Sequence, residues 1–250
     1  MSTTIAISGK GGSGKTTLAA MIIRILHNQT KGPVLAVDAD PNSCLGQILG
    51  VEPVGTIAEV REKAAQGGPS GSGADRVRSF EYGIQQAITE ANGFDLLTMG
   101  WPEGPGCYCA ANNLLRTFLD KLSSAYEFVV IDNEAGMEHL SRRSNNNIDL
   151  LCIVTEPSPL GMVTAKRISG LAKELPISVK NIGVIWNRAD KAESNRELEN
   201  IEVFGCVPYD KAVFDASMNG KTVFDIEQNS PALLAVWNII KHKLNLKQIM

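Results

Sequence analysis

The chain has 250 residues, of which 44% are hydrophobic and 20% charged, and its formal net charge is −3. This balance is typical of a globular protein and gives no sign of a DNA-binding surface. The N-terminus shows no signal-peptide pattern, and no stretch approaches the roughly 18 apolar residues of a membrane span. An odd count of five cysteines argues against a disulfide framework. We therefore expect a cytoplasmic protein that binds neither nucleic acid nor membrane.

Short apolar runs alternate along the chain with stretches of helical spacing. Strands are predicted at residues 3–8, 33–40, 94–100, 128–136, 149–157 and 181–190, and helices at residues 16–29, 113–124 and 163–175. Residues 66–75 are rich in small and helix-breaking residues and are typical of a surface loop. Continuous apolar strands that alternate with helices indicate a parallel sheet covered on both faces. We predict an α/β fold, one doubly wound domain over residues 1–250 whose mostly parallel sheet is flanked by helices.

A glycine-rich segment, SGKGGSGKTT, lies between the first predicted strand and the first predicted helix. Three of its glycines match the dinucleotide pattern G-x-G-x-x-G, but Lys15 and Thr16 also complete the phosphate-loop pattern G-x-x-x-x-G-K-[ST]. A dinucleotide fold does not need these two residues, whereas a triphosphate site does, because the lysine neutralises β and γ oxygens and the threonine hydroxyl ligates Mg²⁺. The segment predicts a nucleoside-triphosphate and Mg²⁺ site built from Gly11, Gly12, Ser13, Gly14, Lys15, Thr16 and Thr17.

Lys10 is a second lysine near the start of this segment and completes the pattern K-G-G-x-x-G-K-[ST]. The pattern resembles the deviant Walker A motif of the MinD/ParA/nitrogenase-iron-protein class of P-loop ATPases, in which this lysine reaches across a dimer interface. DADPNS (38–43) resembles switch I of that class, and IDNEAG (131–136) resembles its Walker B and switch II segment. The resemblance implies ATP/ADP as the nucleotide and catalytic roles for Lys10, Lys15 and Asp40. Asp40 would position the attacking water, and Asp132 would hold Mg²⁺ through water.

Two later segments extend the resemblance to nearly the whole chain. WNRAD carries Asn187 and Arg188 where the class reads adenine after a late strand. VPYDKAVFDAS places Pro208 and Asp210 where the class has a loop beside the base. The resemblance implies that these four residues bind the nucleotide, and that Gly136 senses the γ-phosphate.

The stretch EGPGCYCAAN sets Cys107 and Cys109 one residue apart. In an extended backbone residues i and i+2 point the same way, so both sulfurs can face one ion. Two thiolates are only half of the shell that Zn²⁺ commonly takes. A face-to-face homodimer would bring in a second pair about its twofold axis. Two incidental cysteines, or a redox disulfide, are the alternatives.

GWPEGPGCYCAANNLLR and IDNEAGMEHLSRR also resemble stretches of the CooC/AcsF-type ATPases, which mature carbon monoxide dehydrogenase and acetyl-CoA synthase by helping nickel into their clusters. The resemblance implies ATP hydrolysis coupled to metal delivery, from a Cys-x-Cys site shared across a homodimer to such a client enzyme. Thiolates accept both Ni²⁺ and Zn²⁺, so the ligands by themselves do not choose the metal.

Two other functions stay open. An iron–sulfur electron-transfer protein resembling the nitrogenase iron protein would also use four thiolates, although residues 132–144 lack the cysteine that its second loop supplies. A MinD-like positioning ATPase would use the basic tail from Leu233 as a membrane anchor. The apolar spacing in that tail instead favours a helix packed on the sheet through Leu233, Trp237, Ile240 and Leu244.

Overall fold

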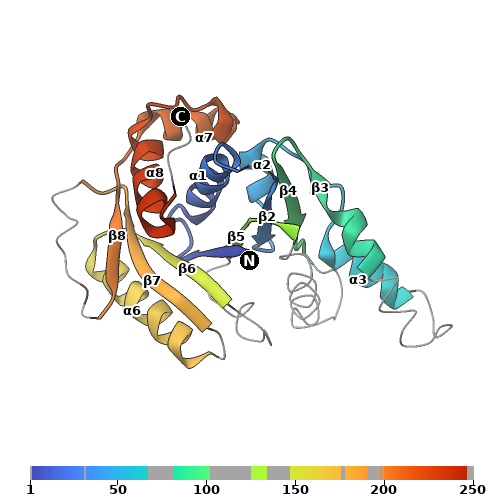
Figure 1. The fold of residues 1–250 in the computed structure, drawn as a ribbon, viewed down its shortest axis with the longest axis horizontal. Coiled ribbons are helices and arrows are strands. Elements are labelled where there is room, and N and C mark those ends of the chain that lie inside the picture. The colour runs from blue at the N-terminus through green and yellow to red at the C-terminus, as the bar shows by residue number, and fades with distance from the viewer. Residues whose placement is uncertain are drawn as a thin grey trace.

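The computed structural model describes residues 2–30, 32–66, 81–101, 125–133, 147–175, 178–190, 198 and 200–246. Within this part of the chain, one sheet of eight strands has the order β3-β4-β2-β5-β1-β6-β7-β8. Every pair of neighbours is parallel except β3 and β4. Helices lie on both faces of the sheet (Figure 1). The predicted fold class is confirmed.

The strands are β1 (Thr3–Gly9), β2 (Val34–Ala39), β3 (Thr89–Glu90), β4 (Phe94–Thr98), β5 (Phe128–Asn133), β6 (Asn147–Thr155), β7 (Ser178–Asn187) and β8 (Glu202–Val207). The helices are α1 (Lys15–His27), α2 (Leu45–Leu49), α3 (Ile57–Gln66), α6 (Pro159–Glu174), α7 (Lys211–Met218) and α8 (Pro231–Leu244), with the 3-10 helix η3 (Val223–Asp225) and helical residues 81–87. The six predicted strands correspond to β1, β2, β4, β5, β6 and β7. The predicted helix 113–124 and all but the first residue of the predicted loop 66–75 lie outside the described residues.

The apolar runs are continuous because the central strands are buried on both faces. Along β1, Ile5 and Ile7 pack in the core that includes α1 and α8, whereas Ala6 between them packs in the core beneath α6. This alternation follows from the two-residue period of a strand. Ile57 of α3 and Ile84 of residues 81–87 pack over β2, β4 and β5. A sequence without polar alternation is therefore what this three-layer arrangement requires.

The C-terminal helix α8 packs as a core helix. Leu233, Val236 and Ile240 are buried in the same cluster as α1, and Trp237 and Leu244 pack against its edge. Figure 1 shows α8 beside α1 on one side of the sheet, with α6 on the other. The predicted packing of this tail is confirmed. None of the described helices is long and apolar enough to cross a membrane.

The order of strands places the glycine-rich segment at a special point of the sheet. β1 lies between β5 and β6, so the chain winds outward from it in both directions. In open parallel sheets, ligands bind beyond the carboxyl ends of the strands where the winding direction changes. The segment between β1 and α1 occupies this point, and the ends of β2, β5, β6 and β7 surround it.

Candidate functional site

The turn between β1 and α1, residues 10–14, has the backbone of a phosphate-binding loop. Gly12 and Gly14 have φ angles of 78° and 92°, a left-handed region that glycine adopts without steric cost. Gly14 also has no room for a side chain, since a Cβ would lie 2.4 Å from Nδ2 of Asn187. Lys15 begins α1 and is buried. The loop therefore faces the positive end of a helix, which favours an anion.

Two buried aspartates end the strands next to this loop. Asp38 on β2 and Asp132 on β5 are register neighbours and are 0% and 1% exposed. Neither oxygen of Asp132 has a hydrogen-bond donor within the described part of the chain. Burial raises the pKa of Asp132 to about 6, against the opposing effects of the nearby Thr16 hydroxyl and Lys15 ammonium. Burial likewise raises the pKa of Asp38 to about 7.

An orphaned carboxylate beside a threonine hydroxyl fits Mg²⁺, which prefers oxygen ligands. The residues that would hold it are Thr16 directly and Asp132 through water. No group of three or more His, Cys, Asp or Glu side chains among the described residues is arranged to hold a metal ion. Mg²⁺ does not require such a group, because it keeps several waters and takes phosphate oxygens.

The loop after β2 is fixed by Asp38. The carboxylate of Asp38 accepts from the backbone N–H of Leu45 at 2.8 Å and of Asp40 at 3.2 Å. Asp40 in turn accepts from the backbone and side-chain amides of Asn42, both at 2.9 Å. The negative charge of Asp40 contributes to the raised pKa of Asp132. The predicted catalytic Asp40 therefore lies at the same end of the sheet as the predicted Mg²⁺ residues.

A pocket of about 130 Å³ lies on the other side of the phosphate loop. It brings together Gly14 and Thr17 with all four of the predicted base-binding residues, namely Asn187, Arg188, Pro208 and Asp210. Tyr209 and Phe214 also line it, with ring centroids 6.3 Å apart. These aromatic side chains lie within the segment predicted as a base-side loop, although the structure makes Lys211–Met218 a helix, α7. The pocket offers flat apolar surface suited to a nucleobase.

Asp210 has a structural role at the wall of this pocket. Its carboxylate caps α7 by accepting from Ala212 N–H at 2.8 Å, and it accepts from Ser230 Oγ at 2.6 Å and Ala232 N–H at 3.1 Å. Burial acts to raise the pKa of Asp210, but these hydrogen bonds outweigh it and the pKa is lowered. The carboxylate thus joins α7 to α8 and keeps the pocket wall in place.

Asn187 and Arg188 contact the phosphate loop itself. Asn187 Nδ2 donates to Ser13 O at 2.8 Å, and Arg188 Nη1 donates to Gly12 O at 3.4 Å. Arg188 also pairs with Glu156 at 3.2 Å. We did not predict a role for Glu156 from the sequence. The sequence feature that could have indicated this role is an acidic residue directly after the carboxyl end of a central strand.

Lys10 lies exposed at the tip of the loop. A hollow of about 160 Å³ lies between residues 10–13 and the segment that leads into α6. Glu156, Ser158 and Leu160 line it on the α6 side. Leu160 and Val163 leave 59% and 63% of their surface exposed. This side of the molecule therefore combines an exposed lysine with exposed apolar side chains.

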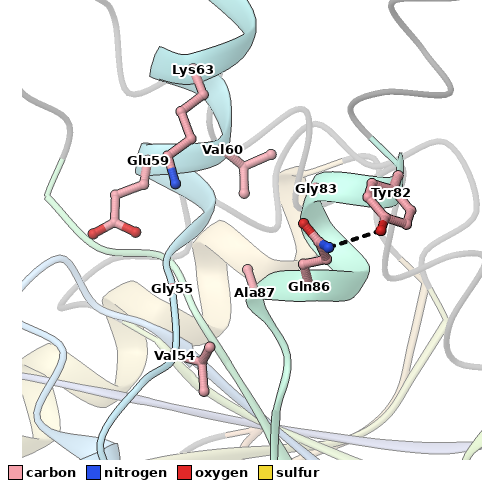
Figure 2. Close-up of a pocket in the computed structure, with 9 residues that line it drawn as sticks. All are labelled: Val54, Gly55, Glu59, Val60, Lys63, Tyr82, Gly83, Gln86 and Ala87. Carbon is pink, nitrogen blue, oxygen red and sulfur yellow. Dashed lines mark hydrogen bonds between the residues drawn. The ribbon is translucent and has the colours of Figure 1, made fainter.

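A larger hollow of about 670 Å³ lies away from the predicted site (Figure 2). Figure 2 shows it between α3, with Glu59 and Lys63, and residues 81–87, where Gln86 donates to the Tyr82 hydroxyl at 2.9 Å. Among the described residues that line it, none is predicted to bind nucleotide or metal. Cys107, Cys109 and Gly136 lie outside the described residues.

A phosphate loop between the first strand and first helix, with an unpartnered aspartate ending a neighbouring strand, defines the class of P-loop nucleotide-binding proteins. The chain belongs to the CobQ/CobB/MinD/ParA nucleotide-binding domain family, whose sequence model matches residues 4–223.

Relatives of full length support this membership. The chain is 38% identical over 252 residues to an uncharacterized ATP-binding protein of Methanocaldococcus jannaschii, covering 97% of this chain and 99% of the relative. It is 32% identical over 251 residues to the carbon monoxide dehydrogenase accessory protein CooC of Rhodospirillum rubrum, covering 91% and 90%.

Solved structures share the fold at lower identity. A ParA family ATPase from Chlorobium tepidum matches with a TM-score of 0.72 at 19% identity, over 98% of this chain and 99% of the other. The septum site-determining protein MinD of Pyrococcus horikoshii, complexed with Mg-ADP, matches with a TM-score of 0.70 at 21% identity, over 97% and 96%.

Proposed function

We propose that this protein is an ATPase that dimerises with ATP and carries nickel to a client enzyme, either a carbon monoxide dehydrogenase or an acetyl-CoA synthase. The observation that carries the ATPase half is the buried, unpartnered carboxylate of Asp132 beside Lys15 and Thr16. The nickel half is supported by the Cys-x-Cys pair in the sequence and by the similarity to a carbon monoxide dehydrogenase accessory protein.

In the proposed hydrolysis step, each site residue has a different role. Water attacks the γ-phosphorus, the bond to the bridging oxygen breaks, and ADP leaves with that electron pair while the proton of the water passes to phosphate or solvent. The loop amides and Lys15 hold the phosphates, and Asp40 orients the water. Mg²⁺, when bound, neutralises charge that develops on the phosphate oxygens.

Binding of the nickel ion would require a second copy of the chain. Each chain supplies two thiolates, Cys107 and Cys109, and a tetrahedral thiolate shell takes four. Lys10 on the exposed loop tip would contact the partner's nucleotide, so ATP would favour the closed dimer and hydrolysis would loosen it. ATP drives such a cycle only by binding one of the two states more tightly.

The experiment that tests the proposal measures molecular mass and bound metal together. Purified protein is compared without additions, with Ni²⁺, with ATP and with both, while released phosphate is followed. We expect one ion for every two chains in the dimer. The Cys107→Ser and Cys109→Ser variants should lose this metal and keep nucleotide binding, because the thiolates are the ligands. The Cys44→Ser control, which removes an exposed thiol outside the pair, should keep both.

Metal retained by both serine variants, or an ion held tightly by a single chain, would contradict the shared site. Broad charge-transfer absorbance in anaerobically purified protein would instead indicate an iron–sulfur cluster. A protein that releases no phosphate from ATP under any of the four conditions would contradict the ATPase half.

A further inference from the structure

The end of β7 holds the phosphate loop through two consecutive side chains, and we refer to Asn187 and Arg188 together as the β7 clamp. Asn187 is 7% exposed and donates to Ser13 O at 2.8 Å. Arg188 donates to Gly12 O, the preceding carbonyl of the loop, and its charge is balanced by Glu156. Two neighbouring carbonyls of the loop are therefore bound by the last residue of β7 and the residue that follows it.

This arrangement departs from ordinary strand geometry. Successive side chains of an extended strand point to opposite faces. Arg188 has a φ angle of 53°, a left-handed conformation that is uncommon for a residue with a long side chain. The left-handed turn brings both side chains to the loop. Uncommon backbone conformations of this kind persist where surrounding contacts impose them, and they concentrate at functional sites.

The hydrogen bond from Asn187 also orients a loop N–H group. Ser13 O and Gly14 N–H belong to one planar trans peptide unit, so they point in opposite directions. Holding the carbonyl toward β7 therefore directs the Gly14 N–H away from β7. A Cβ at Gly14 would lie 2.4 Å from Nδ2 of Asn187, so the Asn187 amide lies directly against the glycine of this peptide.

The same bond fixes how the Asn187 amide is turned in the pocket that it lines. Ser13 O is an acceptor, so the amide atom that meets it must be the NH₂ group. The amide oxygen and the second N–H are then left for a ligand in the pocket. One side chain thus touches both the phosphate loop and the base pocket.

We propose that the β7 clamp is a positioning device for the phosphate loop, which sets the loop in its binding conformation before a nucleotide arrives. The inference rests on the proposed nucleotide-binding function and extends the role of Asn187 beyond contact with the base. A clamp of this kind acts on every polyphosphate ligand. A residue that only contacts the base acts on nucleotides alone.

The test compares a ligand with a base and a ligand without one. Calorimetry with Mg²⁺ measures the affinity of an uncleavable ATP analogue and of tripolyphosphate for the wild-type protein and for Asn187→Ala. Loss of a buried hydrogen bond at the loop should weaken both ligands by about tenfold. Phe214→Ala is the matched control, because Phe214 lines the same pocket but its ring has no donor for the loop carbonyls. It should weaken the ATP analogue and leave tripolyphosphate unchanged.

Hydrogen exchange of the ligand-free protein gives a second readout. Peptides covering residues 10–17 should exchange faster in Asn187→Ala and in Arg188→Gln than in the wild type, while peptides from β1 and β6 stay protected if the variants are folded. If Asn187→Ala does not fold, Arg188→Gln still tests the clamp, because Arg188 is exposed.

If Asn187→Ala weakens the ATP analogue alone and loop exchange does not change, the clamp is overturned and Asn187 is a base-binding residue only. If the wild type binds neither the ATP analogue nor tripolyphosphate, the proposed function fails. The exchange comparison still decides for or against the clamp in that case.

Discussion

The carboxyl group of Asp132 is costly to ionise when no cation is bound beside it. It is buried with no donor in hydrogen-bonding geometry among the described residues, and burial raises its pKa from 3.8 to about 6, although the nearby Thr16 hydroxyl and Lys15 ammonium act to lower it. The folded, ligand-free protein therefore holds a proton at pH values where the unfolded chain has lost it. Stability falls as the pH rises from about 4 to about 6, and the loss amounts to about 3 kcal/mol for two pH units. A cation bound at Asp132 would remove this cost, since it favours the ionised form.

We predict that Asp132→Asn stabilises the nucleotide-free, Mg²⁺-free protein at high pH. The amide cannot ionise, so the free energy of unfolding in urea should exceed that of the wild type by up to about 3 kcal/mol at pH 8. The difference should vanish below about pH 3, under the unfolded-state pKa of 3.8, where the wild-type carboxyl is protonated in both states. Asp190→Asn, at an exposed position, is the control and should change neither value. A variant less stable than the wild type at pH 8 would contradict the assignment.

At the scale of elements, α1 is joined to the C-terminal part of the chain by a buried cation. Arg24, in the second half of α1, is 6% exposed and donates through Nη1 to Val223 O at 2.5 Å and Ile226 O at 2.7 Å. These carbonyls belong to the first residue of η3 and to the residue that follows it, and η3 is separately fixed by the capping box of Thr222 and Asp225. The helix that carries the phosphate loop is therefore tied to the segment between α7 and α8, which form the base-pocket wall.

Replacing Arg24 with Met should destabilise the protein, because it removes two charge-assisted hydrogen bonds and leaves two carbonyls without this donor. We expect a loss of about 2–3 kcal/mol in the free energy of unfolding, measured by urea denaturation. Arg24→Lys keeps the charge and can reach fewer acceptors, so it should fall between the wild type and Arg24→Met. Equal stability of all three proteins would show that η3 does not depend on this contact.

At the scale of the whole molecule, we propose that the side that carries Lys10 contacts a second copy of the chain. Lys10 is exposed on the loop and lines the hollow at α6 together with Leu160, which is itself exposed, and Val163 is a second exposed apolar side chain of α6. Lys15, by contrast, is buried at the base of the loop. The two lysines of one motif therefore differ in what they can reach, and we expect their substitutions to separate dimerisation from nucleotide binding.

We predict that the wild type changes from monomer to dimer when an uncleavable ATP analogue and Mg²⁺ are added, as measured by light scattering. Lys10→Ala should stay monomeric while its affinity for the analogue stays within about threefold, a change of under 1 kcal/mol. Lys15→Ala should lose nucleotide binding itself. Lys221→Ala, at an exposed position away from the loop, should dimerise like the wild type. A Lys10→Ala variant that dimerises normally would exclude the role assigned to this lysine.

The main features of the fold could be predicted because they depend on local pattern. Apolar runs such as residues 33–40 identify strands buried on both faces, and the glycine loop with Lys15 and Thr16 identifies a phosphate site between a strand and a helix. The shorter elements β3, β8, α2 and α7 were not predicted, since they are brief or only partly apolar. The order of strands was also not predictable from pattern, because it depends on which distant strands pair.

The residues of the candidate site could be named from the sequence, but their contacts could not. Asn187 and Arg188 were predicted to bind the base, and both line the pocket beside the phosphate loop, but their contact with a base stays a prediction. Their hydrogen bonds to Gly12 and Ser13 depend on the left-handed backbone of Arg188 and on a separation of more than 170 residues along the chain. Glu156 gained its role only because β6 and β7 are neighbours in the sheet.

The sequence by itself determined the class of site, since spacing of glycine, lysine and threonine within a short segment is a local property that the backbone cannot rearrange. It also determined which face of α8 is apolar. Only the tertiary structure decided that this face packs with α1, because periodicity identifies an apolar face and not what covers it. The raised pKa of Asp132 was decided in the same way, since a side chain loses its water only when distant parts of the chain close around it.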